Sequence, residues 1–332
     1  MTWIVWRQYR IQAAISTALL VAFAIFTVIT GLHLATEWHQ SLLACTAAND
    51  CNTGGGLFEG DKGVGLVVIM TLGVPAVLGL FWGAPLVASE LETGTLQWTW
   101  MQSVTRVRWF AAKAGCLMLA AAVWGGAVAA LVTWWSGPRN ALYLDKFTAG
   151  NFDIQGFAPV GYALFAMALG ILAGTVLRRT VPAMAVTLGG FIAVRVVITL
   201  WVRQHYIAAV TTYYSLTSNF TARGSSWIFS QGLTGPHGPL SQATGTAQPD
   251  AGVMLFDGVP VSNLPAACQA AANSTNPSAA NSCLASAHIQ QYITYQPASR
   301  YWAFQGIETG VYVLLAAALV AATIAIIRRR DA

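Results

Sequence analysis

Six long, largely apolar stretches decide what this chain can fold into. They lie at about 12–34, 64–88, 110–135, 157–177, 181–202 and 303–327. A helix needs roughly 20 consecutive apolar residues to cross the hydrocarbon core of a bilayer, and every stretch reaches this length. Only 9% of the residues are charged, whereas soluble domains carry about 25%. The sequence therefore predicts an all-α polytopic membrane protein with six transmembrane helices.

Lysine and arginine are distributed unequally between the two sets of ends and loops that six spans create. One set, close to the span ends, contains Arg7, Arg10, Arg106, Arg108, Lys113, Arg178, Arg179, Arg328, Arg329 and Arg330. The opposite set, spread over a longer stretch of chain, contains Lys62, Arg139, Lys146, Arg203, Arg223 and Arg300. Because cytoplasmic loops carry the excess of positive charge, we expect a multi-pass protein of the cell membrane with both termini cytoplasmic. The formal net charge of +5 then reflects topology, and we expect no nucleic-acid partner.

Four of the five cysteines fall on the outer side of this topology. They are Cys45, Cys51, Cys268 and Cys283, whereas Cys116 lies inside a span. An oxidising compartment favours disulfides over free thiols. We therefore expect two disulfides outside the membrane, with four free thiols as the alternative.

The distribution of polar sequence divides the chain into four parts. Residues 1–11 form a predicted cytoplasmic interfacial helix, and residues 12–202 form the first five spans, with a cytoplasmic coupling loop at 89–108. Residues 203–301 form an extracellular loop, and residues 302–332 form the sixth span with a basic cytoplasmic tail. The extracellular loop is too long for a mere connector, so we expect it to fold into a cap.

Two signals describe this cap between helices 5 and 6. Residues Val253–Val261 consist of two short apolar runs around Asp257-Gly258, which predicts a β-hairpin. Alanine-rich segments on either side of Asn276-Pro277 predict two short helices, and a Cys268–Cys283 bridge would staple them. The expected cap is a small disulfide-stapled α/β structure and not an independent enzyme domain.

The N-terminal part mixes aromatic and basic side chains. Trp3 and Trp6 stand close to Arg7 and Arg10. This composition suits a helix that lies at the cytoplasmic surface of the membrane. The alternative is that these residues simply anchor the first span, as tryptophan and arginine often do.

The sequence contains no catalytic constellation. It has no GxxxxGK[ST] phosphate loop, and the glycine-rich segment Thr53–Gly65 has the wrong spacing for one. His33, Glu37 and His39 lack a metal-site spacing such as HExxH. We expect no catalytic residue, no metal site and no cofactor bound by this chain. Gly170–Gly174 matches the small-xxx-small pattern of close helix packing.

Two ionisable residues, Arg195 and Glu308, lie inside predicted spans. An unpaired charge at the middle of a bilayer costs about 2.5–3.5 kcal/mol. With a rise of about 1.5 Å per residue, Arg195 lies roughly 9 Å and Glu308 roughly 8 Å from the outer ends of their spans. The matched depths predict an intramembrane Arg195–Glu308 pair that fixes span five against span six. Alternatively, Arg195 extends outward or lines a wet cavity.

Several polar segments together carry a family resemblance. They are Gly83–Ala88, Glu90–Glu92, Gly94, Thr95, Gln102–Arg106, Trp109, Trp6–Gln8, Arg10, Arg195, Arg203–Tyr206, Gln296, Pro297, Arg300, Trp302, Gln305 and Glu308. In order and spacing this pattern resembles the permease subunits of ABC-2 type transporters, especially the short actinobacterial kind. The resemblance extends loosely over all six spans. Gln204 departs from it, because a proline is expected there.

The resemblance implies the membrane-spanning permease subunit of an ATP-driven exporter, which forms the substrate pathway as a dimer, here expected to be a homodimer. Two copies of a separate ATP-binding subunit would hold ATP and Mg and dock on a cytoplasmic helix between spans two and three. The implied coupling residues are Glu90, Glu92, Gly94, Thr95, Trp98, Trp100, Gln102, Ser103 and Arg106. One alternative is an ion-driven secondary transporter, which predicts several membrane carboxylates. Another is a non-transporting membrane receptor that uses its extracellular loop.

Overall fold

The chain is organised in two compact units. The computed structural model describes residues 2–48, 62–92, 106–138, 140, 146–215, 226–236, 238–240, 243–244, 265–266, 268–269 and 277–329. The helical unit comprises Met1–Ala141, Ala149–Tyr206 and Trp302–Ala332, and the sheet unit comprises Leu142–Thr148 and Ile207–Tyr301. Each unit is described by itself.

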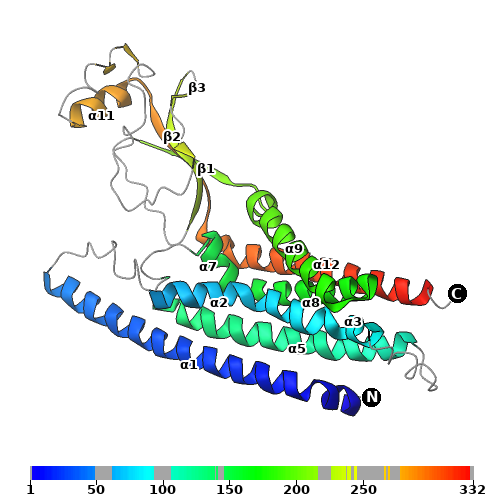
Figure 1. The fold of residues 1–332 in the computed structure, drawn as a ribbon. Helices are drawn as coiled ribbons and strands as arrows, with labels where there is room; N and C mark the ends of the chain where they lie inside the picture. Colours follow the sequence, from blue (N-terminus) through cyan, green and yellow to red (C-terminus); the bar gives the residue numbers. More distant parts are fainter. Residues whose placement is uncertain are drawn as a thin grey trace. The chain divides into compact units, whose positions relative to one another are not determined.

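Long helices make up the helical unit (Figure 1). They are α1 (Thr2–Ala48), α2 (Lys62–Leu78), α3 (Pro85–Glu92), α5 (Arg106–Trp135), α7 (Ala149–Ile154), α8 (Ala158–Leu177), α9 (Thr180–Val197) and α12 (Tyr301–Arg329). Two π-helical turns, η1 (Gly79–Gly83) and η2 (Ile198–Val202), interrupt the second and fifth spans, and the 3-10 turn η3 (Arg203–His205) follows η2.

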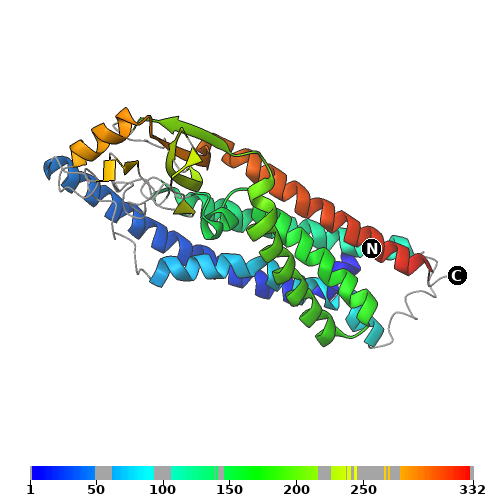
Figure 2. The same ribbon diagram turned by 90° about the horizontal axis from the view of Figure 1, so that it is seen from above.

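Six segments of the described residues are long and apolar enough to cross a membrane. They are Ala14–Glu37, Gly63–Glu90, Val107–Trp135, Ala158–Leu177, Thr180–His205 and Ala298–Arg329. The prediction of six spans is therefore confirmed. Because six crossings return a chain to the side on which it began, the N and C termini lie at the same end of the helical unit (Figures 1 and 2).

Helix α8 is the central helix of this unit. It contacts α2, α5 and α9, and most of its side chains are buried. Alanine and glycine dominate its sequence, so neighbouring backbones approach it closely. A Cβ at Gly170 would collide with the carbonyl of Gly79, and a Cβ at Gly174 would collide with the carbonyl of Ala84. The close packing predicted for Gly170–Gly174 is thus confirmed.

The second span is broken where it passes α8. Pro85 has no N–H to continue a regular helix, and the chain widens into η1 just before it. There the N–H of Ala84 donates to the carbonyl of Gly79 at 2.9 Å, a bond between residues five apart. Glycines at both ends of η1 let this irregular turn lie directly against α8. The short helix α3 then leads to the end of the span at Glu92.

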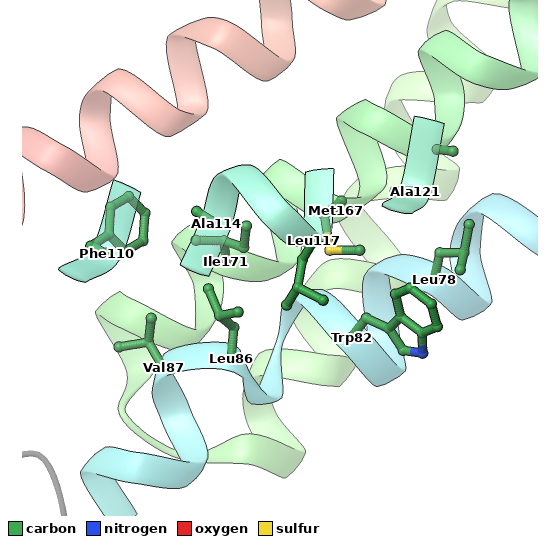
Figure 3. Close-up of a cluster of buried hydrophobic side chains, with 11 residues drawn as sticks. Leu78, Trp82, Leu86, Val87, Phe110, Ala114, Leu117, Ala121, Met167 and Ile171 are labelled. Carbon is green, nitrogen blue, oxygen red and sulfur yellow. The ribbon is translucent and has the colours of Figure 1, made fainter. Parts of the chain in front are cut away.

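An apolar cluster joins three of these helices (Figure 3). Leu78, Trp82, Leu86 and Val87 come from the α2–η1–α3 span, Phe110, Ala114, Leu117 and Ala121 from α5, and Met167 and Ile171 from α8. The rings of Trp82 and Trp124 meet edge to face, 6.1 Å apart. Burial of this cluster fixes the start of α5 beside α3, although residues 93–105 between them lie outside the described residues.

The sheet unit contains an antiparallel sheet that the sequence did not predict. Its strands are β1 (Val210–Tyr214), β2 (Trp227–Gly235), β3 (Gly238–Pro239), β4 (Ala243–Thr244) and β5 (Gln290–Gln296), in the order β1-β5-β2-β3 with β4 paired to β2. Residue Tyr213 lies opposite Tyr292, and Ile228 lies opposite Tyr295. The predicted hairpin Val253–Val261 lies outside the described residues.

A disulfide staples this unit. Cys268 is bonded to Cys283 on helix α11 (Pro277–Ser286), with 5.7 Å between their Cα atoms. Around the bond, Leu233 of β2 packs with Leu284 and Ile289. The predicted Cys268–Cys283 bridge is confirmed, and α11 begins at the Pro277 that was expected to separate two helices. Cys45 lies near the end of α1, and Cys51 lies outside the described residues.

Candidate functional site

Five polar side chains of the helical unit meet in one group, called here the charge cluster. Its members are Asp153 of α7, Tyr162 of α8, Arg195 of α9, Arg203 of η3 and Glu308 of α12. Four of them are buried, and Glu308 has no exposed surface at all; the Arg195 side chain is 13% exposed. Two guanidinium groups face two carboxylates, so the cluster is balanced in charge.

Arg203 forms the centre of the cluster. Its Nε and Nη2 atoms donate to the two carboxylate oxygens of Glu308, each at 2.7 Å, and Nη2 also pairs with Asp153. The guanidinium carbon lies 4.3 Å from the ring centroid of Phe152. Such two-pronged pairing is the strong form of an arginine–carboxylate contact. Arg203 thereby joins the end of the fifth span to α7 and α12.

Arg195 and Tyr162 complete the cluster. Nη2 of Arg195 lies 2.7 Å from Oδ2 of Asp153, and its guanidinium carbon lies 3.6 Å from the ring centroid of Tyr162. The Tyr162 hydroxyl donates to Oε1 of Glu308 at 2.6 Å. Asp153 is therefore shared by two arginines, while Tyr162 connects the Arg195 half of the cluster to the Glu308 half.

The predicted Arg195–Glu308 pair is corrected by this geometry. Arg195 and Glu308 do belong to one cluster, but Arg195 is paired with Asp153 and Glu308 is paired with Arg203. Three members, Asp153, Tyr162 and Arg203, were not predicted to join this group. Asp153 precedes α8 by a few residues and was read as part of an outer loop, and Arg203 was assigned to the extracellular loop, whereas it is 1% exposed inside the helical unit.

The π-helical turn η2 explains why sequence periodicity could not find Arg203. In a regular α-helix, residues eight apart are rotated by about 80° beyond two full turns, which would point Arg195 and Arg203 in different directions. The N–H of Arg203 donates instead to the carbonyl of Ile198, five residues earlier. One extra residue in a turn removes about 100° of rotation. Both arginines therefore reach the same carboxylate, Asp153.

A second polar group, called here the α3 corner, lies at the other end of α9. It consists of Glu90 and Glu92 of α3, Lys113 of α5 and Thr180 of α9. Thr180 is the first residue of α9 and Arg195 is fifteen residues further on, or about 22 Å along the helix. Helix α9 thus has one polar group at each end.

In the α3 corner, Glu90 forms an ion pair with Lys113. The Lys113 side chain is 3% exposed and the Glu90 side chain 14% exposed, and the Lys113 ammonium lies 5.0 Å from the Trp109 ring centroid. This pair joins the two helices that flank residues 93–105. Glu90, which the family resemblance implied as a coupling residue, has its carboxylate engaged within the chain.

Glu92 is exposed and holds the start of α9. One carboxylate oxygen accepts the backbone N–H of Thr180 at 2.9 Å, and the other accepts its hydroxyl at 2.6 Å. The hydroxyl bond, then the backbone bond, and more weakly the charge of Arg179 lower the pKa of the Glu92 carboxyl. Arg179, at the N-cap position of α9, makes no side-chain cap. Glu92 therefore supplies from another helix the acceptor that the local sequence lacks.

Near the charge cluster, Gln305 of α12 holds the start of α8, as Glu92 holds the start of α9. Its Oε1 atom accepts the backbone N–H groups of Phe157 and Ala158 at the start of α8, and its Nε2 atom donates to the carbonyl of Phe152 in α7. Helix α12 is therefore fixed to α7 and α8 by Gln305 as well as by Glu308.

The remaining predicted residues are dispersed. Trp3, Trp6 and Arg7 belong to the first turns of α1, which is continuous from Thr2 to Ala48, so residues 2–11 do not form a separate helix. Arg10 is exposed and Arg106 begins α5. Gly94, Thr95, Trp98, Trp100, Gln102 and Ser103 lie outside the described residues.

Cysteine and histidine add no further site in the described part of the chain. Cys116 is a free thiol in α5. His33 and Glu37 lie 3.6 Å apart on one face of α1. Among the described residues, no group of three or more histidine, cysteine, aspartate or glutamate side chains could hold a metal ion.

Comparison with known proteins finds one matching protein family. The family model described as "ABC-2 membrane transporter related" matches residues 17–203. This range is more than half of the 332 residues. It begins within the first span, ends at Arg203 within the fifth, and includes four of the five members of the charge cluster. No curated protein and no solved structure matches the chain.

Proposed function

Because the chain belongs to the ABC-2 membrane transporter related family, we propose that this ABC-2 type permease is the membrane-spanning subunit of an ATP-driven exporter. The observation that carries the proposal is the family match across five spans that the structure also contains. The sixth span lies outside the match, but Glu308 pairs it with Arg203 at the end of the matched region.

In this proposal the chain forms the transmembrane pathway, and a separate subunit binds ATP. An ABC-2 permease is the non-catalytic transmembrane component, and its family implies an ATP-binding partner. The sequence contains no phosphate loop of its own. ATP and Mg would therefore be held by the partner, two copies of which would dock on the segment at residues 89–108.

The proposed topology places the charge cluster near the exit of the pathway. The lysine and arginine distribution favours cytoplasmic termini, with the coupling segment and the α3 corner on the same side. The α/β sheet unit would then form the extracellular cap. Two such chains, expected to be identical, would enclose the pathway, and the charge cluster would shape its outer part.

The geometry favours this proposal over an ion-driven transporter. That rival requires membrane carboxylates that take up and release a coupling ion. Asp153 and Glu308 are both paired with arginine in the charge cluster. Carboxylates neutralised by fixed guanidinium groups are suited to holding helices together, and they are poorly suited to carrying a cation.

Co-purification tests the proposal directly. The tagged chain is expressed in its own host, solubilised in a mild detergent together with any ATPase subunit it retains, and reconstituted in liposomes. We expect a stable complex whose ATP hydrolysis is lost when the catalytic glutamate of the ATPase is replaced by glutamine. Recovery of the chain without an ATPase, under conditions that preserve such complexes, would contradict the proposal. Uptake driven by an ion gradient alone would support the secondary transporter instead.

A further inference from the structure

Helix α9 packs against α8 through a small number of buried side chains, and polar contacts hold both of its ends. Among α9 and η2, only Ala183, Thr187, Phe191 and Ile198 are buried. By contrast, Glu92 accepts two hydrogen bonds at the first residue of α9, and the charge cluster engages Arg195 and then Arg203 at its far end.

The first end is tied to the predicted coupling segment. Glu92 is the last residue of α3, and residues 93–105 follow it directly. A helix begins with N–H groups that have no partner within the helix, and a carboxylate both accepts their hydrogen bonds and complements the helix dipole. Any displacement of the last turn of α3 therefore acts on the start of α9 through Glu92.

The second end is tied to two other helices of the unit, α7 and α12. Arg195 and Arg203 pair with Asp153 of α7 and Glu308 of α12. The helical segment between the ends is continuous from Thr180 to His205 apart from the wide turn η2. A continuous helix of this kind moves as one body, so a shift at Thr180 changes the position of both guanidinium groups.

We propose that Glu92 is a positioning residue that transmits the movement of the coupling segment, through Thr180 and the rigid helix α9, to the charge cluster. This inference rests on the proposed function and gives Glu92 a different role from the one first expected. Glu92 acts as a hydrogen-bond acceptor within its own chain, and not as a charge that docks the ATPase.

Variants of Glu92 separate these two roles. Glu92→Gln keeps an acceptor for Thr180 and removes the negative charge, whereas Glu92→Lys removes both. If Glu92 transmits movement, Glu92→Gln behaves nearly as the natural protein does and Glu92→Lys does not. If Glu92 docks the partner by its charge, both variants lose the partner. Glu37→Gln is the matched control, because Glu37 is a glutamate of α1 whose carboxylate lies beside His33 of the same helix.

The readout is a single cysteine at Gln204, which is exposed beside Arg203. Gln204→Cys is combined with Cys116→Ala, which removes the free thiol of α5, and with Cys45→Ser and Cys51→Ser, so that the other two cysteines of the chain are those of the Cys268–Cys283 disulfide. Maleimide labelling at position 204 is then measured in the full complex, with and without ATP and vanadate. We expect trapping to change the labelling rate several-fold in the natural background, in Glu92→Gln and in Glu37→Gln, and to leave it unchanged in Glu92→Lys.

Other results would contradict either the role of Glu92 or the proposed function. If Glu92→Lys retains the partner and the labelling change, α9 does not receive its movement through Glu92. If the natural background keeps the partner and hydrolyses ATP but shows no labelling change, the far end of α9 does not move. Both results contradict the inference and leave the proposed function intact. If no ATPase co-purifies with any variant, the proposed function itself fails.

Discussion

The two polar groups at the ends of α9 differ in how much of their charged surface is exposed. The charge cluster is sealed inside the helical unit, where Arg203 and Glu308 are 1% and 0% exposed. The α3 corner lies at the other end of α9 and combines the buried Lys113 with the exposed Glu92. In the first group, the loss of one charged member leaves another charge buried without its counter-charge.

This difference indicates which polar contacts contribute most to the stability of the chain. A sealed and balanced cluster resists gradual change, since moving one charge leaves another unpaired. A hydrogen bond at an exposed position, such as those between Glu92 and Thr180, contributes less to stability, because water satisfies both partners once the bond is broken. We therefore expect substitutions at the charge cluster to have large effects on stability, and substitutions at the α3 corner to have smaller ones.

The largest effect is expected from breaking the Arg203–Glu308 pair. Arg203→Met leaves Glu308 buried beside an excess of negative charge, which should lower the free energy of unfolding by about 3–5 kcal/mol. The double variant Arg203→Met with Glu308→Met retains the balanced Arg195–Asp153 pair and should recover much of this loss. Thermal unfolding of the detergent-solubilised chain measures both. A double variant no more stable than the single one would show that the cluster is not held by charge balance.

The next effect concerns the ion pair of the α3 corner. Lys113→Met leaves Glu90 with little exposed surface and no cation, which should cost about 1–3 kcal/mol. The exchange Glu90→Lys with Lys113→Glu should restore most of the lost stability. Arg108→Met is the control, because Arg108 is an exposed cation of the same helix. Equal unfolding temperatures for Lys113→Met and Arg108→Met would contradict the importance of the pair.

A comparable but purely steric effect is expected at the contact between η1 and α8. Gly170→Ala places a Cβ against the Gly79 carbonyl and the Ala84 nitrogen, so the backbones must separate, at about 1–3 kcal/mol. Gly189→Ala has no atom within 4 Å of its new Cβ and should be neutral or slightly stabilising, because alanine is the better helix former. If the two variants unfold at the same temperature, the close approach of α8 to η1 is not required.

The sequence was sufficient for the features that depend on length and composition. Apolar stretches of about 20 residues indicate membrane spans whatever their exact packing, and the sequence predicted all six spans. The Cys268–Cys283 bridge and the break at Pro277 were also accessible, because cysteine pairs and proline act locally. In the sheet unit, strands β1, β2 and β5 were missed. Their partners are distant in sequence, and their alternation is interrupted by polar and aromatic residues such as Tyr213 and Tyr292.

The charge cluster shows a different limit of sequence reasoning. Depth along a regular helix correctly placed Arg195 and Glu308 near each other, but it could not assign their partners. The turn η2 rotates Arg203 into the cluster, and nothing in the local sequence specifies a π-helical turn. The contacts of Glu90 and Glu92 could not be predicted either, because Lys113 and Thr180 are distant in sequence and reach them only through tertiary packing.

The smallest expected effect is a pH dependence at Glu92, and it tests the exposed end of α9 most directly. Its pKa is lowered from 4.5 by the hydrogen bonds from Thr180. A carboxyl whose pKa is lower in the folded state stabilises that state above its unfolded value, and this contribution disappears as the pH falls through the folded value.

The natural protein should therefore unfold at a slightly higher temperature than Glu92→Ala at pH 7, and the difference should shrink as the pH falls below 4.5 and vanish once the carboxyl is protonated in the folded state. Thr180→Val, which removes the hydroxyl donor, should reduce the same difference at pH 7. Thermal unfolding of the three proteins across this range measures the effect. A difference that stays constant with pH would mean that Glu92 stabilises the start of α9 through packing and not through its charged carboxylate.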